Sequence, residues 1–237
     1  MATIELLEGF LRTEIVKEGR RLIKEHLNIF DDLRDTQVQL VAVNSLQPTF
    51  PAARTFCGWL EKREERFRKQ TCHCVRRSRI KPLAKLIGAS ERHFEKCLKK
   101  TSRKAAAGLL VRVVERAFRR TAQLRARIDR RRPETIHKTR VAFKRFRYMM
   151  ELLAEHFGAD EKVLAEMQHY QRMMGDIQDA EVLLRSFEKF VRKKNIRSEA
   201  AYQLREELER RREWLIKVYM GAAGQLKEFW PVRGRVT

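Results

Sequence analysis

Hydrophobic residues recur at intervals of three and four along most of this chain, the spacing that one face of an α-helix requires. Regular alternation of β-branched residues, which is typical of sandwiches and barrels, does not occur. The pattern therefore predicts an all-α fold. We expect helices over residues 4–25, 29–46, 52–70, 83–87, 90–100, 104–130, 134–157, 160–194 and 198–229, followed by an unstructured tail.

A few residues mark where these helices should begin and end. Pro48 and Pro51 break the second helical pattern, because proline cannot continue a helix. Ser90 has the character of an N-cap, and Pro133 favours a helix start at its own position. We also expect a break near Gly221 or Gly224 in the last helix.

The chain contains a weak internal repeat. Residues 30–40 align without gaps on residues 174–184, with four identities at a constant offset of 144. The identical pairs include Asp32 with Asp176 and Asp35 with Asp179. Four identities in eleven helical residues also arise by chance. The repeat predicts two related helical bundles in tandem, over residues 1–103 and 104–230, with a tail over 231–237.

The segment from Ile136 to Met150 carries a cationic stripe on an amphipathic helix. At 100° per residue, four side chains fall within about 80° of one another. The apolar side chains of the same segment gather on the opposite side, and the segment holds no acid. Like charges at this spacing destabilise an isolated helix, so we interpret the stripe as a ligand surface in preference to an ordinary solvated face. The stripe comprises His137, Arg140, Lys144 and Arg147, with Arg145 at its edge, and Phe143, Phe146, Met150 and Leu153 lie opposite.

Three other helices repeat this arrangement. Their cations are spaced to share one helix face, but Glu115 and Glu188 lie nearby, and simple solvation explains these faces nearly as well. The cations are Arg112, Arg116 and Arg119, then Arg185, Lys189 and Arg192, and finally Arg20, Arg21 and Lys24.

Composition adds one strong fact: 53 Lys and Arg residues against 31 Asp and Glu residues give a formal net charge of +22. Such an excess repels itself in a compact fold, so we expect an anionic partner, although a merely soluble surface is the alternative. Arginine outnumbers lysine, and its planar fork suits phosphate oxygens. The four cysteines are sparse and irregularly spaced, which favours a reducing cytoplasm. No apolar run is long enough for a membrane span.

The cationic stripe resembles the signature of a known family. The residues His137-x-x-Arg140-Val141-x-x-Lys144-Arg145-x-Arg147 are similar to the H-x-L-R-V-x-x-R-R-L-R helix of the CHAD domain, the conserved histidine α-helical domain. The segments 33–38 and 177–182 resemble the family's L-G-x-x-R-D-x-x-V element, which occurs once in each half. The resemblance implies two pseudo-symmetric four-helix bundles whose facing basic surfaces form a groove for inorganic polyphosphate. It also implies that the domain does not catalyse a reaction.

From the stripe and this resemblance together we predict a cytoplasmic polyphosphate-binding protein, associated with polyphosphate granules. The predicted binding residues are His137, Arg140, Lys144, Arg145, Arg147, Arg20, Arg21, Lys24, Arg34, Arg112, Arg116, Arg119, Arg185 and Lys189.

The chain departs from the family pattern at several positions. Thr139 stands for leucine, Lys144 for arginine, Phe146 for leucine and Gln178 for arginine. Subtracting 144 from His137 gives a position before Met1. We therefore expect the N-terminal bundle to lack its first helix, either because the sequence starts inside that bundle or because this member has dispensed with the helix.

Other functions agree less well with the sequence than polyphosphate binding does. Nonspecific nucleic-acid binding is the main alternative, because the charge attracts any polyanion, but no helix-turn-helix, RRM, KH or zinc-finger signature is present. Walker A, G-x-S-x-G and H-E-x-x-H motifs are absent, so we expect no enzymatic activity and no cofactor. Cys72, His73, Cys74, His93 and Cys97 match no standard zinc spacing, and we expect no metal site.

Overall fold

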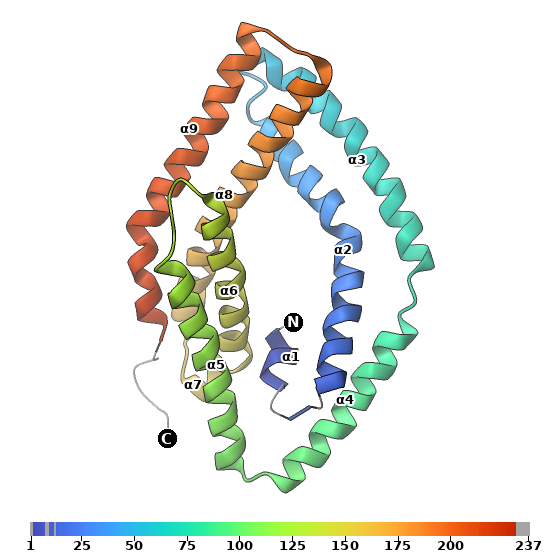
Figure 1. Cartoon of the computed structure of the whole chain (residues 1–237), viewed down its shortest axis with the longest axis vertical. Helices are drawn as coiled ribbons and strands as arrows, with labels where there is room; N and C mark the ends of the chain where they lie inside the picture. The colour runs from blue at the N-terminus through green and yellow to red at the C-terminus, as the bar shows by residue number, and fades with distance from the viewer. Residues whose placement is uncertain (1, 8–9, 12, 231–237) are drawn as a thin grey trace. The chain divides into compact units, whose positions relative to one another are not determined.

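The computed structural model of the chain describes residues 2–7, 10–11 and 13–230 (Figure 1). Within these residues there is no strand, which confirms the all-α prediction. The predicted tail over residues 231–237 lies outside the described residues. In chain order the helices are α1 (Ala2–Leu6), α2 (Thr13–Asn44), α3 (Pro51–Arg77), α4 (Lys81–Lys100), α5 (Arg103–Arg125), α6 (Pro133–Leu152), α7 (Ala154–Phe157), α8 (Glu161–Lys194), α9 (Glu199–Ala222) and the 3₁₀ helix η2 (Ala223–Phe229).

Several helix boundaries follow the local signals of the sequence. Pro51 and Pro133 occupy the first turns of α3 and α6, where the missing N–H is not needed. The hydroxyl of Ser102 accepts a hydrogen bond from the Ala105 amide at the start of α5. The predicted break near Gly221 is also confirmed, because α9 gives way to η2 after Ala222.

Several boundary predictions are wrong. The predicted helix over residues 4–25 is divided, because α1 ends at Leu6 and α2 begins at Thr13, and the predicted helix over 134–157 is divided into α6 and α7. Ser90 is not an N-cap: α4 runs through it, and its hydroxyl donates to the Leu86 carbonyl 2.8 Å away. The expected gap at residues 25–29 does not occur either, because α2 continues from Thr13 to Asn44. No proline or glycine interrupts that stretch after Gly19, so the helical hydrogen bonds can continue through it.

The residues form two compact units, each made of segments that are distant in sequence. Unit 1 consists of Met1–Glu25, Arg79–Met174 and Gly221–Thr237. Unit 2 consists of His26–Ser78 and Gly175–Met220. Helices α2 and α8 therefore contribute to both units. The division of the chain into sequential halves at residues 103 and 104 stays a prediction.

Unit 1 has an aromatic core around α6. The ring of Phe143 lies 4.8 Å from that of Tyr170 and 5.7 Å from that of Phe229, measured between centroids. Phe146 packs at 5.4 Å against Phe118 of α5. The Tyr170 hydroxyl donates to the Ala223 carbonyl at 3.3 Å, so its one polar atom is satisfied inside the core. These contacts hold the apolar face of α6 in place and fix which way its other face points.

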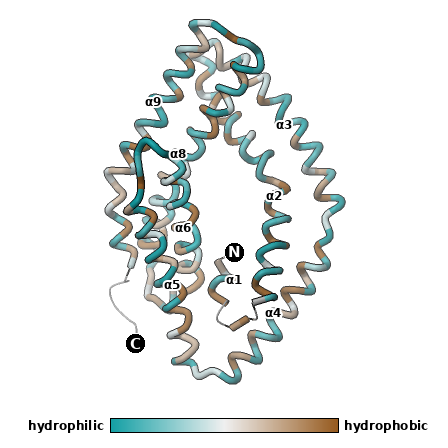
Figure 2. Tube along the Cα trace, in the orientation of Figure 1, coloured by the Kyte–Doolittle hydropathy of each residue, from teal (hydrophilic) through white to brown (hydrophobic). Residues whose placement is uncertain are grey.

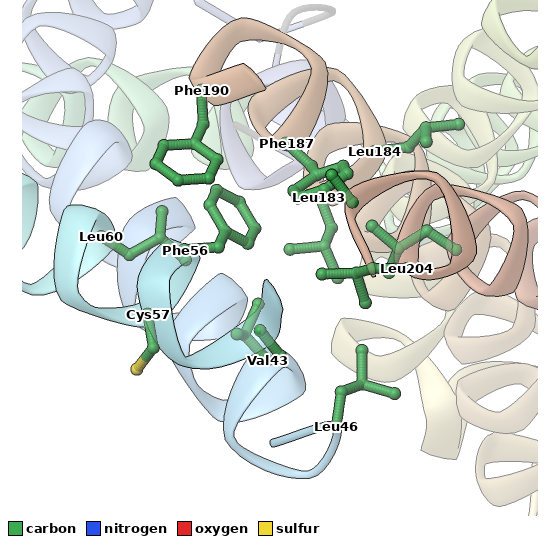
Figure 3. Close-up of a cluster of buried hydrophobic side chains, with 13 residues drawn as sticks. Val43, Leu46, Phe56, Cys57, Leu60, Leu183, Leu184, Phe187, Phe190 and Leu204 are labelled. Atoms are coloured by element: carbon green, nitrogen blue, oxygen red, sulfur yellow. The ribbon is translucent and has the colours of Figure 1, made fainter. Parts of the chain in front are cut away.

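Unit 2 has its own hydrophobic core, formed by side chains of α2, α3, α8 and α9 (Figure 3). Phe56 packs against Phe187 at 5.1 Å and against Phe190 at 5.3 Å. Val43 and Leu204 are also buried in this cluster. Along the helices of both units hydrophobic residues recur between hydrophilic ones (Figure 2). Amphipathic packing therefore accounts for the fold of each unit.

The two copies of the repeated segment both contribute acids to unit 2. Partial burial raises the pKa of the Asp35 carboxyl above its usual range, and the adjacent Arg34 acts in the opposite direction. The carboxylate of Asp179, the counterpart of Asp35 in the repeat, raises that pKa further. The repeat thus brings two equivalent acids within electrostatic reach of each other.

This raised pKa gives a pH-dependent effect on stability. A charged Asp35 is less favourable in the folded chain than in the unfolded chain, so Asp35→Asn is expected to increase the free energy of unfolding at pH 7. The gain should shrink as the pH falls through the raised pKa, and vanish below the unfolded value of about 3.9, where the aspartate is protonated in both states. Urea unfolding of both proteins between pH 3 and pH 7 measures this. A variant that is less stable at pH 7 would contradict it.

Candidate functional site

The cationic stripe lies on α6, and the packing of that helix follows its sequence pattern. Phe143, Phe146 and Met150 are buried, as the pattern predicts. Thr139 is fully buried as well, and its hydroxyl donates to the Thr135 carbonyl at 2.9 Å. The small side chain that replaces the family's leucine is therefore accommodated inside the unit. The core fixes the orientation of α6 and leaves the other side for cations.

Arg140 and Lys144 lie half-buried on α6, and no carboxylate of the described residues is within ion-pair distance of either. The Nε atom of Arg140 is buried and has no hydrogen-bond partner among those residues. The ammonium group of Lys144 lies 5.7 Å from the centroid of the Tyr148 ring, a cation–π contact. His137, one turn before Arg140, is also half-buried. An anion at this position would find the charges of Arg140 and Lys144, which no described carboxylate neutralises.

Arg147 does not belong to this exposed set, so the prediction that it projects from the helix is wrong. It is 7% exposed, and its Nε donates to Oε1 of Gln171 in α8 at 2.9 Å. Its Nη1 pairs with Glu151 one turn later, and the guanidinium stacks on Tyr148, 4.4 Å from the ring centroid. A buried guanidinium requires such partners. Arg147 therefore has a structural role in unit 1.

The Glu5 carboxylate of α1 forms ion pairs with arginines of two other helices. Its Oε1 atom lies 3.8 Å from Nη2 of Arg20 in α2 and 3.5 Å from Nη1 of Arg145 in α6. The Glu5 side chain is only 14% exposed, whereas that of Arg145 is 50% exposed. Arg20 and Arg145 therefore converge on one carboxylate oxygen. We call the set Arg20, His137, Arg140, Lys144 and Arg145 the α6 cationic cluster.

The remaining predicted cations of unit 1 are not all equally available. Arg21 is held between Glu18 and Glu25, each with a contact of 2.6 Å, and these bonds raise the pKa of its guanidinium. Arg119 pairs with Glu115 at 2.7 Å. By contrast Lys24, Arg112 and Arg116 are exposed without a described carboxylate partner. An ion pair between exposed side chains of one helix contributes little to stability. An external anion can therefore displace the carboxylates from Arg21 and Arg119.

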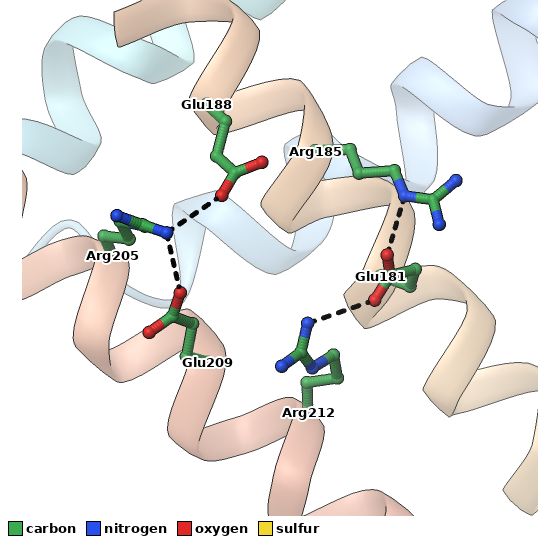
Figure 4. Close-up of polar contacts among 6 residues, drawn as sticks. All are labelled: Glu181, Arg185, Glu188, Arg205, Glu209 and Arg212. Atoms are coloured by element: carbon green, nitrogen blue, oxygen red, sulfur yellow. Dashed lines mark hydrogen bonds and ion pairs between the residues drawn. The ribbon is translucent and has the colours of Figure 1, made fainter. Parts of the chain in front are cut away.

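The three predicted cations of unit 2 are Arg34, Arg185 and Lys189. Arg185 donates a hydrogen bond to Glu181 at 2.6 Å, and Glu181 also accepts one from Arg212 of α9 at 3.3 Å (Figure 4). Because Glu181 is buried, both arginines serve to compensate its charge. Arg34 and Lys189 are exposed on α2 and α8. The structure thus assigns Arg185 a partner within unit 2.

The sequence did not indicate two side chains that hold arginines of this site: the Glu5 carboxylate and the Gln171 amide. Glu5 lies in a short helix far from α6 in sequence, and Gln171 comes from α8. Neither has a motif or a spacing that would indicate its partner. Only the packing of α1 and α8 in unit 1 reveals them.

No group of three or more His, Cys, Asp and Glu side chains among the described residues is arranged to hold a metal ion. All four cysteines are free. No helix in the described part of the chain is long and apolar enough to cross a membrane.

Fold and site define an all-α protein in which Arg140 and Lys144 lie half-buried on α6 with no carboxylate of the described residues within ion-pair distance. The family model of the CHAD domain matches residues 2–188, which include the cationic stripe and both repeated segments. The chain therefore belongs to the CHAD domain family, as its motifs indicated. No curated protein and no solved structure matches the chain.

Proposed function

We propose that this CHAD-family chain binds inorganic polyphosphate through the α6 cationic cluster, and that it does so without catalysis. One observation carries the proposal: the Nε–H of Arg140 is buried, has no acceptor among the described residues and belongs to a segment, residues 136–150, that contains no acid. A phosphate oxygen supplies the missing acceptor, and a charge-assisted hydrogen bond of this kind is among the strong ones.

The chemistry of the cluster fits a chain of phosphates better than a nucleic acid. Polyphosphate offers one charge per phosphate, without bases that need stacking partners. Phe143 and Phe146 of α6 are buried and offer no stacking surface, and the Tyr148 ring already contacts Lys144 and Arg147. Binding also relieves the mutual repulsion of the cations on α6. Arg112 and Arg116 of unit 1 extend the proposed contact set.

Direct titration tests this function. Long-chain polyphosphate added to the protein at about 150 mM salt is expected to give saturable binding that weakens as salt rises, because counterions are released from the polyanion. Prolonged incubation of the same mixture is expected to release no orthophosphate. Absence of binding at that salt concentration would overturn the proposal, and release of orthophosphate would overturn its non-catalytic part.

Glu5 gives a prediction of the opposite sign. Its carboxylate occupies the space between Arg20 and Arg145 and so competes with an external anion. Glu5→Gln is expected to tighten polyphosphate binding about two- to fivefold, the range that a partly exposed ion pair allows. Glu18→Gln is the matched control, since it removes one negative charge beside Arg21, outside the cluster. Equal affinities of the two variants would show that only net charge matters.

A further inference from the structure

Unit 2 contains a cavity between α8 and α9 that the proposed function does not use. It lies beside the connection of residues 195–198 and has a volume of about 460 Å³, within the range of roughly 300–1,000 Å³ typical of small-molecule sites. Part of its lining is apolar, and Phe187 and Ala201 of that part belong to the hydrophobic core of the unit. Val191 and Ile196 also line the cavity and pack against this core. The core therefore holds the apolar lining in place.

Hydrogen bonds fix the backbone beside this cavity. The amide of Ile196 donates to the Val191 carbonyl at 3.1 Å, and the amide of Asn195 donates to the Arg192 carbonyl at 3.4 Å. Asn195 has a φ of 49°, so α8 ends in the pattern of a Schellman motif, in which the apolar side chains of Val191 and Ile196 are brought together. The hydroxyl of Ser198 accepts a hydrogen bond from an amide of the first turn of α9 at 3.2 Å. Both helix ends are thus capped next to the cavity.

Two arginines of the lining have no carboxylate to neutralise them. Arg192 lies in the last turn of α8 and Arg197 in the connection, and both side chains are exposed. No carboxylate of the described residues lies within ion-pair distance of either guanidinium group. Their planar forks can each donate two hydrogen bonds to one carboxylate or phosphate group.

The other charged residues of the lining compensate one another. Glu188 is the single acid, and its carboxylate lies 3.3 Å from Nη2 of Arg205 (Figure 4). Arg205 also pairs with Glu209 of α9 at 3.1 Å. Even when Arg205 is fully neutralised by these two carboxylates, the charges of Arg192 and Arg197 remain. The lining is therefore positive on balance as well as partly apolar.

We propose that this cavity binds an amphipathic anion, an organic molecule with an apolar body and one carboxylate or phosphate head. The apolar body covers Val191 and Ile196, and its burial removes apolar surface from water. The head accepts charge-assisted hydrogen bonds from Arg192 and Arg197. An apolar cation would meet like charge, whereas polyphosphate has no apolar part and would leave the apolar lining in water. The ligand class follows from residues of unit 2 alone and does not depend on polyphosphate binding.

Calorimetric titration of the full chain with octanoate, hexanoate and octylammonium, at about 150 mM salt in buffer without phosphate, tests this proposal. The formal charge of +22 attracts any anion to the protein surface, but that attraction does not depend on chain length. Octanoate buries two more methylene groups, so we expect it to bind about tenfold more tightly than hexanoate. Octylammonium should bind at least about tenfold more weakly than octanoate. Octyl phosphate, titrated in the same way, identifies the preferred head group, and either preference supports the proposal.

Three variants locate the site. Arg197→Ala is expected to weaken octanoate binding about fivefold or more, because it removes a charged donor to the head. Lys193→Ala is the matched control: it removes the same charge from the last turn of α8, but Lys193 does not line the cavity, so the loss should stay below about twofold. Ile196→Ala keeps both arginines and should weaken octanoate about fivefold through the lost apolar contact. Melting temperatures without ligand verify that all three variants are folded.

Four results would overturn the inference. Equal affinities for octanoate and hexanoate would reduce the binding to surface attraction, and octylammonium that binds as tightly as octanoate would remove the selection for negative charge. Losses of the same size in Arg197→Ala and Lys193→Ala would exclude Arg197 from the site. Unchanged octanoate affinity of a folded Ile196→Ala variant would place the apolar body elsewhere. Since none of these titrations contains polyphosphate, their failure leaves the proposed function untouched.

Discussion

Replacement of Phe143 by alanine is expected to lower the free energy of unfolding by about 3–5 kcal/mol, the usual cost of truncating a buried phenylalanine. The ring is fully buried and touches three other aromatic rings, those of Phe146, Tyr170 and Phe229. These come from α6, α8 and η2, so the cavity left behind cannot close by the movement of one helix. Urea unfolding measures the loss.

Val141→Ala is the control for this prediction. Val141 lies on the same helix but is 36% exposed, so its truncation should change stability by no more than about 0.5 kcal/mol. A Phe143→Ala variant that loses less than about 1 kcal/mol would show that the aromatic core of unit 1 is not packed as described.

Replacement of Arg140 by alanine is expected to weaken polyphosphate binding about tenfold or more, because a charge-assisted hydrogen bond contributes about 1.5–3 kcal/mol. Stability should stay the same or rise slightly, since the variant removes a buried donor that lacks an acceptor. Arg140→Lys retains the charge but not the planar fork, so its affinity should lie between the two. Fluorescence titration with long-chain polyphosphate measures all three proteins.

Arg76→Ala separates the local effect of Arg140 from the effect of net charge. Arg76 is exposed near the end of α3 and lies outside the predicted contact set, yet its loss lowers the formal charge by the same amount. We expect its affinity to fall less than about twofold, because an exposed charge outside the contact set is largely screened at physiological salt. An equal loss of affinity in Arg140→Ala and Arg76→Ala would mean that polyphosphate binding depends only on the total charge of the protein.

The sequence pattern was sufficient to predict what depends on one helix at a time. The period of hydrophobic residues along α6 identified Phe143, Phe146 and Met150 as core residues, and all three are buried. Pro133 marked the start of α6, because that preference depends on the backbone of the first turn alone. The family motifs extended this local information to the membership that the match over residues 2–188 confirms.

Side-chain contacts between two helices could not be predicted from the pattern of one helix. Arg147 lies at the edge of the stripe on a helical wheel, next to the apolar face, and its partner Gln171 is 24 positions away. A long side chain at such an edge can turn to either side, and the partner decides. Glu5 has the same status, since nothing local relates it to Arg20 and Arg145. The prediction that Ser90 is an N-cap failed for a different reason. Helix α4 already begins at Lys81, with Pro82 in its first turn, and it continues through Ser90.

The most direct test of polyphosphate binding is competition between two polyanions of matched charge. Protein bound to labelled long-chain polyphosphate at about 150 mM salt is titrated with unlabelled polyphosphate or with single-stranded DNA carrying the same number of phosphates. Both ligands release counterions, so salt alone does not separate them. If the α6 cationic cluster recognises phosphate chains, polyphosphate will displace the label at a concentration at least about tenfold lower than DNA. Displacement by DNA at the same concentration would contradict the account and leave a polycation without a preferred ligand.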